Sequence, residues 1–395
     1  MDKLADKIAE KIYDKFDALG KTGKPIDGCE WTLLAGFVTE NGGKLEVVSL
    51  ATGTKCIGSK AMCTDGLILN DSHAEVIARR AFLRYLYSEA AKVKQNEESY
   101  IFSGLCQNGK CILRNSVKFY FFTSHVPCGD ASIIPIKPEE NNSIKRCLKR
   151  RYEEMLNASQ GRSISDIHRT GAKPVSEDTH QDPHGAGETY QMRGAVRTKP
   201  GRGDPTLSLS CSDKIARWIF LGVQGALLSQ LISEPIRINL IVIGGGGPYC
   251  KEILEESLLK RSGTKEEPAF FQSNITFKYS AIATNATRPS PTSIIWANIK
   301  QEKPQVAVDG KRQGSTKKNK SKASLLVSKR ELFKDFLSLM ESHYLHLTYR
   351  QAKDMASDYQ NHFKIFKERM GVWAQSKTNT QLFRISKEEL SIKPL

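Results

Sequence analysis

The order of helix-type and strand-type segments along the chain predicts an α/β protein with three layers, in which helices cover both faces of a mixed sheet. Two β-prone runs form a hairpin first, and apolar β-prone runs follow at residues 117–123 and 238–243. Amphipathic runs of helical spacing lie between them, so the order is hairpin, helix, strand, helix, helix, strand, helix. With 395 residues, 39% of them hydrophobic, the chain can bury a sizeable core without disulfides.

The N-terminal segment predicts a helix followed by a hairpin. Residues 2–19 place apolar side chains on one face of a helix, opposite Lys and Asp, so this helix is expected to pack on the core. Residues 31–38 and 45–50 are β-prone, and Asn41-Gly42-Gly43 between them favours a tight turn. The apolar face of the first helix consists of Leu4, Ile8, Ile12 and Phe16.

The tripeptide His73-Ala74-Glu75 opens the next predicted helix. Apolar residues recur after it near helical spacing, and Asp71 or Ser72 is placed to cap the helix start. His73 and Glu75 are therefore expected in the first turn, where backbone N–H groups are free. The apolar positions are Val76, Ile77, Phe82, Leu83 and Leu86.

Two cysteines stand at similar places farther along the chain. The strand at residues 117–123 leads through Pro127 to Cys128, which we expect at the start of another helix. Cys211 lies 83 residues later (211 − 128), with Ser210 or Ser212 as a helix cap. Helix dipoles at such starts favour thiolate. A lone buried cysteine is more often inert packing, but two in these contexts, after a His-x-Glu, indicate a metal site.

A His-x-Glu on one helix and a Pro-Cys on a later one is typical of zinc deaminases. Such a zinc ion needs three protein ligands and an open position for water, while the glutamate moves the proton. We therefore assign His73 and Cys128 as ligands and Glu75 as the proton shuttle. The usual pattern ends Pro-Cys-x-x-Cys, but the third position after Cys128 is Ala131. Cys211 is the best candidate for the third ligand.

The remaining segments are assigned from pattern and composition. We expect loops where polar residues cluster, helices where apolar spacing is helical, and a basic linker where Lys and Arg replace apolar residues. Small residues in 222–228 are expected to continue the helix that begins at Cys211. The assignments are a loop at 90–115, a polar insertion at 138–206, a helix at 249–261, a basic linker at 301–324, and helices at 325–344 and 349–371.

The net charge of +16 predicts a polyanionic partner, with RNA first and DNA or an acidic membrane surface after it. No run of 18 apolar residues and no short apolar leader occurs, so neither a membrane span nor a signal peptide is expected. Nine unevenly spaced cysteines favour a reducing, intracellular compartment. Residues 317–322 are basic, which leaves nucleus and cytoplasm both open.

Between about Trp31 and Trp373, the chain resembles the adenosine-deaminase-acting-on-RNA family. Within that family it is similar to the members that act on tRNA. The resemblance implies a cytidine-deaminase-like α/β/α fold with a helical C-terminal extension. It also implies two regions: 1–30 as an N-terminal helix and lead-in, and 31–395 as the editase domain. The resemblance rests on the blocks Gly53-Thr54-Lys55-Cys56, Leu69-Asn70-Asp71-Ser72-His73-Ala74-Glu75, Pro127-Cys128-Gly129-Asp130 and Ser210-Cys211-Ser212-Asp213-Lys214-Ile215-Ala216-Arg217-Trp218.

The resemblance further implies a buried structural cofactor, inositol hexakisphosphate. Like charges packed inside a fold need such counter-ions. This chain departs from the family at two positions: Ala226 stands where the family has a Ser, and Phe363 stands where it has a Lys in the penultimate helix. Lys364, one position later, and Lys377 are the alternative lysines. The residues carried over are Asn70, Arg79, Arg80, Lys214, Arg217, Trp218, Tyr349, Lys353, Tyr359 and Trp373.

RNA contacts are also carried over from the family. Its flipping loop aligns with Arg169 to Lys173, where editors of double-stranded RNA have a Glu and this chain has Thr170. That difference favours a loop-shaped substrate over a duplex. The Lys199-Pro200-Gly201-Arg202-Gly203-Asp204 segment resembles that of the members acting on tRNA. The expected RNA-binding residues are Thr54, Lys55, Arg169, Thr170, Lys173, Arg197, Lys199 and Arg202.

The resulting hypothesis is zinc-dependent deamination of adenosine to inosine in tRNA, next to the anticodon, as in tRNA-Ala, with no obligate protein partner. An editor of double-stranded RNA is the first alternative, although about 30 residues ahead of the catalytic domain leave no room for a double-stranded-RNA-binding domain. A non-catalytic RNA-binding protein with a structural zinc is the second, but it needs a fourth ligand. A free-nucleoside cytidine deaminase would be shorter and would not need this charge.

Overall fold

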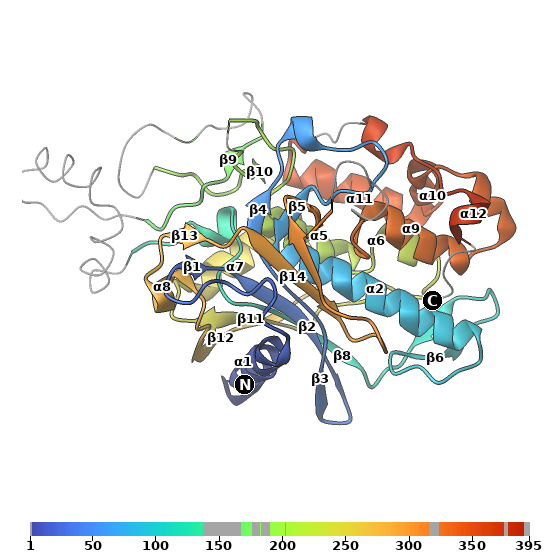
Figure 1. The fold of residues 1–395 in the computed structure, drawn as a ribbon, viewed down its shortest axis with the longest axis horizontal. Coiled ribbons are helices and arrows are strands. Elements are labelled where there is room, and N and C mark those ends of the chain that lie inside the picture. Colours follow the sequence, from blue (N-terminus) through green and yellow to red (C-terminus); the bar gives the residue numbers. More distant parts are fainter. Residues whose placement is uncertain are drawn as a thin grey trace, which may run out of the picture.

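The computed structural model describes residues 2–136, 167–175, 182, 190–201, 203–315, 324–374 and 378–390. An eight-stranded mixed sheet forms the centre, in the order β12-β11-β8-β2-β3-β14-β15-β16 (Figure 1). β12, β11 and β8 are parallel, and every later pair is antiparallel. The strands are β2 (Leu34–Asn41), β3 (Lys44–Thr52), β8 (Lys118–Thr123), β11 (Leu240–Gly245), β12 (Ala269–Thr276), β14 (Thr292–Ala297), β15 (Gln305–Val308) and β16 (Lys311–Arg312).

The expected N-terminal hairpin is confirmed as β2 and β3. The two strands close with Asn41 opposite Lys44. Gly42 and Gly43 between them have φ angles of 58° and 80°. A two-residue turn with positive φ at both positions matches the twist of the flanking strands and suits glycine. The Asn-Gly-Gly segment therefore determines this turn locally.

Alternating side chains of the central strands bury both faces of the sheet, as the predicted three layers require. On one face, Ile12 and Phe16 of α1 (Asp2–Ala18) belong to the same buried cluster as Val38. On the other face, Phe37 stacks on Phe82 of α2 (Ala74–Lys94), with ring centroids 4.5 Å apart. α5 (Cys211–Leu221) and α7 (Lys251–Leu258) contribute to the same cluster as α2.

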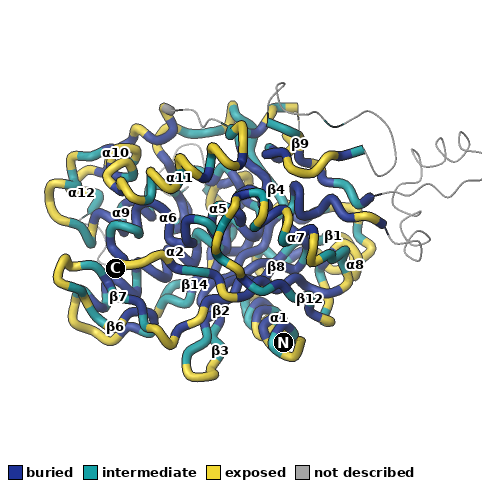
Figure 2. The backbone as a smooth tube through the Cα atoms, turned by 180° about the vertical axis from the view of Figure 1, so that it is seen from behind, coloured by how far each residue is buried: buried dark blue, intermediate teal, exposed yellow. Residues whose placement is uncertain are grey.

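The C-terminal helices pack outside α2 and α5 and add a helical lobe to that side (Figure 1). Phe366 lies against Phe220 of α5, with ring centroids 5.4 Å apart. Figure 2 shows buried positions along the central strands and exposed ones on the outer helices α10 and α12. The helices of this part are α9 (Lys329–Ser338), α10 (Tyr349–Asp354), α11 (Ser357–Met370) and α12 (Lys387–Leu390).

Short elements connect the layers. Two-stranded ladders join β1 to β13, β4 to β5, β6 to β7 and β9 to β10. Their bounds are β1 (Glu30–Trp31), β13 (Arg288–Pro289), β4 (Thr54–Cys56), β5 (Asp71–His73), β6 (Phe102–Leu105), β7 (Cys111–Leu113), β9 (Lys173–Pro174) and β10 (Arg197–Thr198). The short helices are α6 (Gly225–Leu228) and α8 (Ala281–Thr284), with 3-10 turns η1 (Ser59–Ala61), η2 (Asp130–Ser132), η4 (Lys260–Ser262), η6 (Ser342–His346) and η7 (Thr378–Gln381).

Several sequence-based boundaries were wrong. The loop expected at residues 90–115 contains the end of α2 and the β6–β7 hairpin. The linker expected at 301–324 contains β15 and β16, while residues 316–323 lie outside the described part. Gly222, with a φ of 85°, ends α5, so the helix does not continue through residues 222–228. In each case a short element contains polar or small residues, and this composition predicts a loop or a longer helix.

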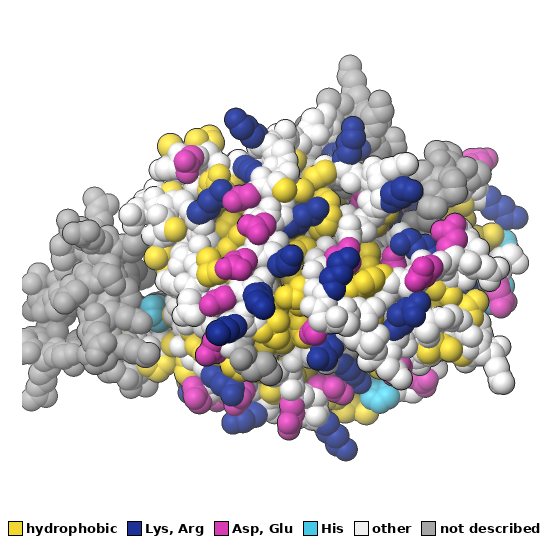
Figure 3. All heavy atoms as spheres, turned by 90° about the horizontal axis from the view of Figure 1, so that it is seen from below, with side chains coloured by type: hydrophobic (Ala, Val, Ile, Leu, Met, Phe, Trp, Pro, Cys, Tyr) yellow, Lys and Arg dark blue, Asp and Glu magenta, His cyan; other side chains and the backbone are white. Residues whose placement is uncertain are grey.

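The two C-terminal helix assignments were too long. The segment 325–344 contains α9 followed by η6, and the segment 349–371 is divided into α10 and α11. None of the described helices combines the length and apolar character that crossing a membrane requires. Positive side chains are not gathered on the face seen from below, where Figure 3 shows Lys and Arg interspersed with Asp and Glu. That face offers no continuous cationic surface.

Candidate active site

His73 lies at the junction of β5 and α2. It is the N-cap residue of α2 and makes no side-chain cap hydrogen bond, so the expected capping by Asp71 or Ser72 is wrong. The Asp71 Oδ1 atom instead accepts a hydrogen bond of 3.0 Å from the His73 backbone N–H. Because the His73 ring is not used in capping, it is available to point away from the helix start.

Cys128 follows β8. The expectation that it begins an α-helix is wrong. The turn after it is the short 3-10 turn η2. Gly129 has a φ of 99°, and a Cβ atom there would lie 2.4 Å from the Ser210 Oγ atom. Only glycine fits this close approach. The approach places Cys128 beside the start of α5, where the Cys211 backbone N–H donates to the Cys128 Sγ atom at 3.3 Å.

Cys211 is the first residue of α5, and this prediction is confirmed. Ser210 is the N-cap residue, and its Oγ atom accepts a hydrogen bond of 3.1 Å from the Asp213 backbone N–H. Both residues are fully buried. The cap fixes the start of the helix, so the Cys211 sulfur has a defined position near the helix N-terminus.

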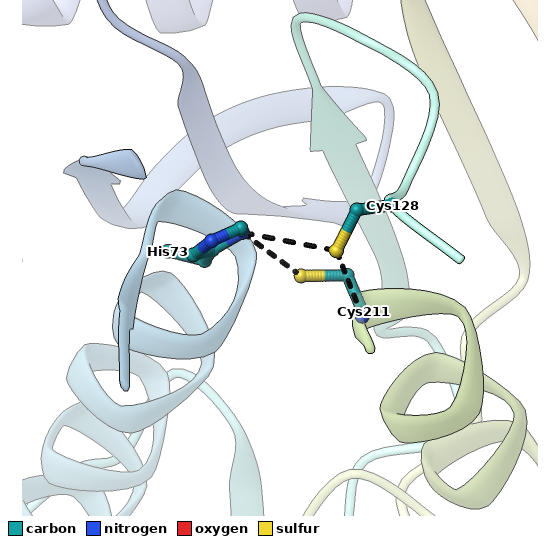
Figure 4. A group of neighbouring side chains, drawn as sticks. All are labelled: His73, Cys128 and Cys211. Atoms are coloured by element: carbon teal, nitrogen blue, oxygen red, sulfur yellow. Dashed lines mark hydrogen bonds between the residues drawn. The ribbon is translucent and has the colours of Figure 1, made fainter. Parts of the chain in front are cut away.

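The three side chains converge from β5, the turn after β8, and α5 (Figure 4). The His73 Nδ1 atom lies 3.9 Å from the Cys128 Sγ atom and 3.6 Å from the Cys211 Sγ atom. All three donor atoms lie within 4.8 Å of one another. One nitrogen and two sulfur donors are a set that zinc prefers, and three ligands leave a fourth position for a water or substrate. The donor set therefore fits a catalytic metal.

Glu75 lies two residues after His73, in the first turn of α2. Its side chain is 1% exposed, and its Oε2 atom has no hydrogen-bond partner among the described residues. Burial raises the pKa of the Glu75 carboxyl above its ordinary value. A buried carboxyl with a free oxygen and a raised pKa can both accept and donate a proton, which suits general acid–base chemistry.

A buried chain of charges leads away from Cys211. The Lys199 Nζ atom donates to the Cys211 Sγ atom at 3.2 Å and to the Asp71 Oδ2 atom at 2.7 Å. The Lys214 Nζ atom donates to the same Asp71 oxygen. Although burial alone would raise the pKa of Asp71, the charges of Lys199 and Lys214 hold it well below its ordinary value. Sequence reasoning missed the role of Asp71, which it treated only as a helix cap.

Lys214 opens onto a cavity of about 610 Å³ between α2, α5 and the C-terminal helices. Its described lining contains eight cationic side chains and one acidic side chain, Asp71. The cations are Arg79, Arg80, Lys214, Arg217, Lys329, Arg350, Lys353 and Lys367. So many like charges around one space indicate a site for a polyanion.

The polar atoms of this cavity are also short of partners. The Arg80 Nη2, Arg217 Nε and Trp218 Nε1 atoms are buried and have no hydrogen-bond partner among the described residues. Burial and the charge of Arg217 lower the pKa of Arg79 to about 9, and burial with Arg217 and Arg350 lowers that of Lys353 to about 7. A bound polyanion would pair these donors and favour their charged forms.

The cavity brings together nine of the ten residues expected to hold a cofactor. These are Asn70, Arg79, Arg80, Lys214, Arg217, Trp218, Tyr349, Lys353 and Trp373. Tyr359 instead lines a neighbouring cavity of about 270 Å³. Lys329, Arg350 and Lys367 were missed, because cations on a polar helix look like a solvated face in the sequence.

The lysines near Phe363 that could replace the family's cofactor-binding lysine lie in different environments. Lys367, one turn after Phe363 on α11, lines the cavity, whereas Lys364 is exposed. Lys377 lies outside the described residues, and Ala226 is buried but does not line the cavity. The cation that the family pattern places at Phe363 is therefore supplied here from the next turn of the helix.

Among the expected RNA contacts, Thr54 and Lys55 lie on β4, beside β5, the strand that ends at His73. Thr54 pairs with His73, and its Oγ1 atom is buried without a hydrogen-bond partner in the described part of the chain. Arg169 lies over the Tyr190 ring at 4.7 Å, and Lys173 is exposed on β9. Arg202 lies outside the described residues.

Three of the expected RNA contacts face the interior of the described structure, and their role in RNA binding stays a prediction. Arg197 is 0% exposed and pairs with Asp130. Lys199 is 2% exposed and pairs with Asp71. The Thr170 Oγ1 atom accepts a hydrogen bond of 2.9 Å from the Gly129 backbone N–H. Their partners lie within the fold: Lys199 also contacts Cys211, and Arg197 also contacts Asp213.

Comparison with known proteins agrees with this geometry. A sequence model of the adenosine-deaminase (editase) domain matches residues 49–377. The tRNA-specific adenosine deaminase 1 of Drosophila melanogaster is 40% identical over 394 residues, which cover 92% of each chain. The Homo sapiens protein of the same name is 32% identical over 501 aligned positions, covering 96% of this chain and 99% of its own.

Similarity to editors of another kind covers less of the chain. The double-stranded RNA-specific editase B2 of Mus musculus is 34% identical over 252 residues, which are 61% of this chain and 30% of that protein. The mixed sheet, the converging His and Cys side chains and the matched domain agree with one another. The chain therefore belongs to the adenosine-deaminase (editase) family and is a hydrolytic deaminase.

Proposed function

We propose that the chain deaminates adenosine to inosine in tRNA, at the adenosine immediately 3′ of the anticodon, as in tRNA-Ala, and so acts in tRNA modification. The observation that carries the proposal is the convergence of His73, Cys128 and Cys211 beside the buried Glu75. The substrate class is supported by relatives named tRNA-specific adenosine deaminase 1, which match more than nine-tenths of this chain.

We infer that zinc is the metal and that His73, Cys128 and Cys211 hold it. When bound, zinc supplies a Lewis acid that lowers the pKa of a water molecule toward about 7. Glu75 accepts a proton from that water as its oxygen attacks C6 of the adenine, and delivers a proton to a ring nitrogen. Glu75 then helps protonate the departing amine, so adenosine and water yield inosine and ammonia. Burial of Glu75 favours both directions of this transfer.

The target base must leave its stack to reach this site. Flipping costs about a few kcal/mol and least for an unpaired base, which an anticodon-loop adenosine satisfies. We propose that Thr54 and Lys55 contact the flipped nucleoside, which is supported by the direct pairing of β4 with the strand that carries His73. The buried, unpartnered Thr54 hydroxyl is a donor and acceptor that this nucleoside can satisfy.

We also propose that inositol hexakisphosphate occupies the cationic cavity as a structural cofactor. Eight described cations and three unpartnered donor atoms fit the six phosphates of this compound better than any single phosphate. Arg side chains pair with phosphate oxygens in two-pronged geometry. Protein made in cells that lack inositol hexakisphosphate is expected to be insoluble or inactive, and full activity there would contradict this part of the proposal.

The decisive experiment incubates total tRNA with the purified protein and reads inosine as A-to-G changes after reverse transcription. Change at a single anticodon-loop adenosine, absent with the Glu75→Ala protein, is the expected result. Change in a long RNA duplex but not in tRNA would replace the substrate with double-stranded RNA. Change in neither, with zinc bound, would contradict deamination and favour an RNA-binding role.

A further inference from the structure

Each of the two cysteines proposed as ligands is followed two residues later by an aspartate. Asp130 comes two residues after Cys128, and Asp213 comes two residues after Cys211. Both carboxylates are buried, at 2% and 1% exposure. Two residues of chain reach at most about 7 Å, so fixing either carboxylate restricts the position of its cysteine.

One arginine joins these two carboxylates. The Arg261 Nη1 atom donates to the Asp130 Oδ2 atom at 2.6 Å, and the Nη2 atom donates to the Asp213 Oδ1 atom. Arg261 comes from η4, after α7, and its side chain is 9% exposed. A planar guanidinium has the rigid fork that can hold two acceptors at a set separation, which an ammonium cannot do.

A second arginine closes the network from the other side. The Arg197 Nε atom donates to the Asp130 Oδ1 atom at 3.3 Å, and the Arg197 backbone N–H donates to the Asp213 Oδ2 atom at 2.9 Å. Each aspartate therefore contacts both arginines, and the four residues form a closed buried ring. Because each aspartate comes two residues after one of the cysteines, the ring can act on the positions of the sulfur atoms through the backbone.

We propose that Arg261, with Asp130, Asp213 and Arg197, is a positioning device that holds Cys128 and Cys211 at the separation a metal requires. The proposal rests on the proposed function only in taking these two cysteines as zinc ligands. Residues that orient metal ligands typically change metal affinity by about tenfold to hundredfold when altered. A network that served only to stabilise the fold would lower the stability of the protein and leave the zinc affinity of the folded state unchanged.

Arg84 provides a matched control. It is also a buried arginine that forks between two carboxylates, Glu302 and Asp335, with a side chain that is 9% exposed. It lies near the middle of α2 and contacts none of the three metal ligands. Arg84→Lys should therefore destabilise the protein in the same way as Arg261→Lys, without an effect on the metal centre.

The experiment measures zinc affinity by competition with a chromogenic chelator, under conditions in which circular dichroism shows each protein to be folded. Arg261→Lys is expected to weaken zinc binding by about tenfold or more, and Arg84→Lys by less than twofold. Asp130→Asn provides a second test, with Asp335→Asn as its control, because it removes one charge without a change in shape.

Zinc affinities within twofold of the unaltered protein for both Arg261→Lys and Asp130→Asn would overturn the inference and leave the proposed function in place. An unaltered protein that bound no zinc would overturn both. A fall in stability with unchanged zinc affinity would assign the ring to folding alone and would likewise overturn the inference.

Discussion

The buried ammonium of Lys199 lies 3.2 Å from the Sγ atom of Cys211. A cation at this distance stabilises a thiolate, which is the form of cysteine that binds metal. The same ammonium pairs with Asp71, and Asp71 pairs with Lys214 at the edge of the cationic cavity. A continuous path of charged contacts therefore connects a metal ligand with the site proposed for a polyanion.

Lys199→Met is expected to destabilise the protein by about 3–5 kcal/mol, because it leaves the buried Asp71 carboxylate with one cation fewer. Urea unfolding of the metal-free protein measures the change. Lys173→Met is the control, since Lys173 is exposed and a surface change of this kind costs within about 0.5 kcal/mol. Equal unfolding free energies for the two variants would show that the Lys199 pair contributes nothing.

Glu75→Gln is expected to reduce inosine formation at least about 10²- to 10⁴-fold, because the amide cannot carry the proton. Zinc content should stay the same, since Glu75 is not among the converging donors. Glu89→Gln serves as the control, because Glu89 is a buried carboxylate of the same helix that binds Ser99 and the Tyr100 backbone. A Glu75→Gln protein with undiminished turnover would rule out the proposed proton transfer.

The stability of the polyanion-free protein is expected to rise with pH. Burial and the charges of Arg217 and Arg350 lower the pKa of Lys353 from 10.5 to about 7. Between these values the unfolded chain holds a proton that the folded chain has lost, so each increase in pH favours folding. The urea midpoint should be higher at pH 9 than at pH 7, and the free energy of unfolding should be larger at pH 9 by up to about a few kcal/mol.

Added inositol hexakisphosphate should abolish or reverse this pH dependence, because its phosphates favour the protonated lysines. Lys329 is expected to contribute in the same direction, since burial and the charge of Arg80 lower its pKa to about 8. A pH dependence of the urea midpoint that is the same in a Lys353→Met protein would show that Lys353 is charged in the empty cavity and would refute the expectation.

Lys367→Met is expected to reduce the stabilisation by inositol hexakisphosphate by about 1–3 kcal/mol, the range for one charge-assisted contact. Lys364→Met on the same helix should change it by less than about 0.5 kcal/mol, because Lys364 is exposed. Thermal shifts with and without the polyanion give both values. The reverse order of the two effects would place the cofactor-binding face of α11 at Lys364, three residues before Lys367.

Local signals were enough to predict parts of the fold. Asn41-Gly42-Gly43 specifies the β2–β3 turn through its positive φ angles, and the apolar face of residues 2–19 specifies the packing of α1. Ser210 predicts the start of α5 because the cap bond forms within four residues. Each of these features depends on side chains that are close in sequence, which a pattern can represent.

Charged residues could not be assigned in the same way. Arg197 and Lys199 were expected to contact RNA, yet both are buried, because carboxylates from other segments, Asp130 and Asp182 for Arg197 and Asp71 for Lys199, compensate their charge. Lys367 and Lys364 are indistinguishable in composition, and only the packing of α11 against α5 turns one inward. The burial of a charge depends on its partner, and the partner is not encoded near it.

The residue types and their order along the chain predict His73, Cys128 and Cys211 as metal ligands and Glu75 as the proton shuttle, because very few types of side chain bind metal. The ring of Arg261, Asp130, Asp213 and Arg197 appears only in the folded protein. Its members come from four separate segments, and the free energy that holds them together comes from mutual charge compensation at close range. Such compensation is a property of distances in space, which no local pattern contains.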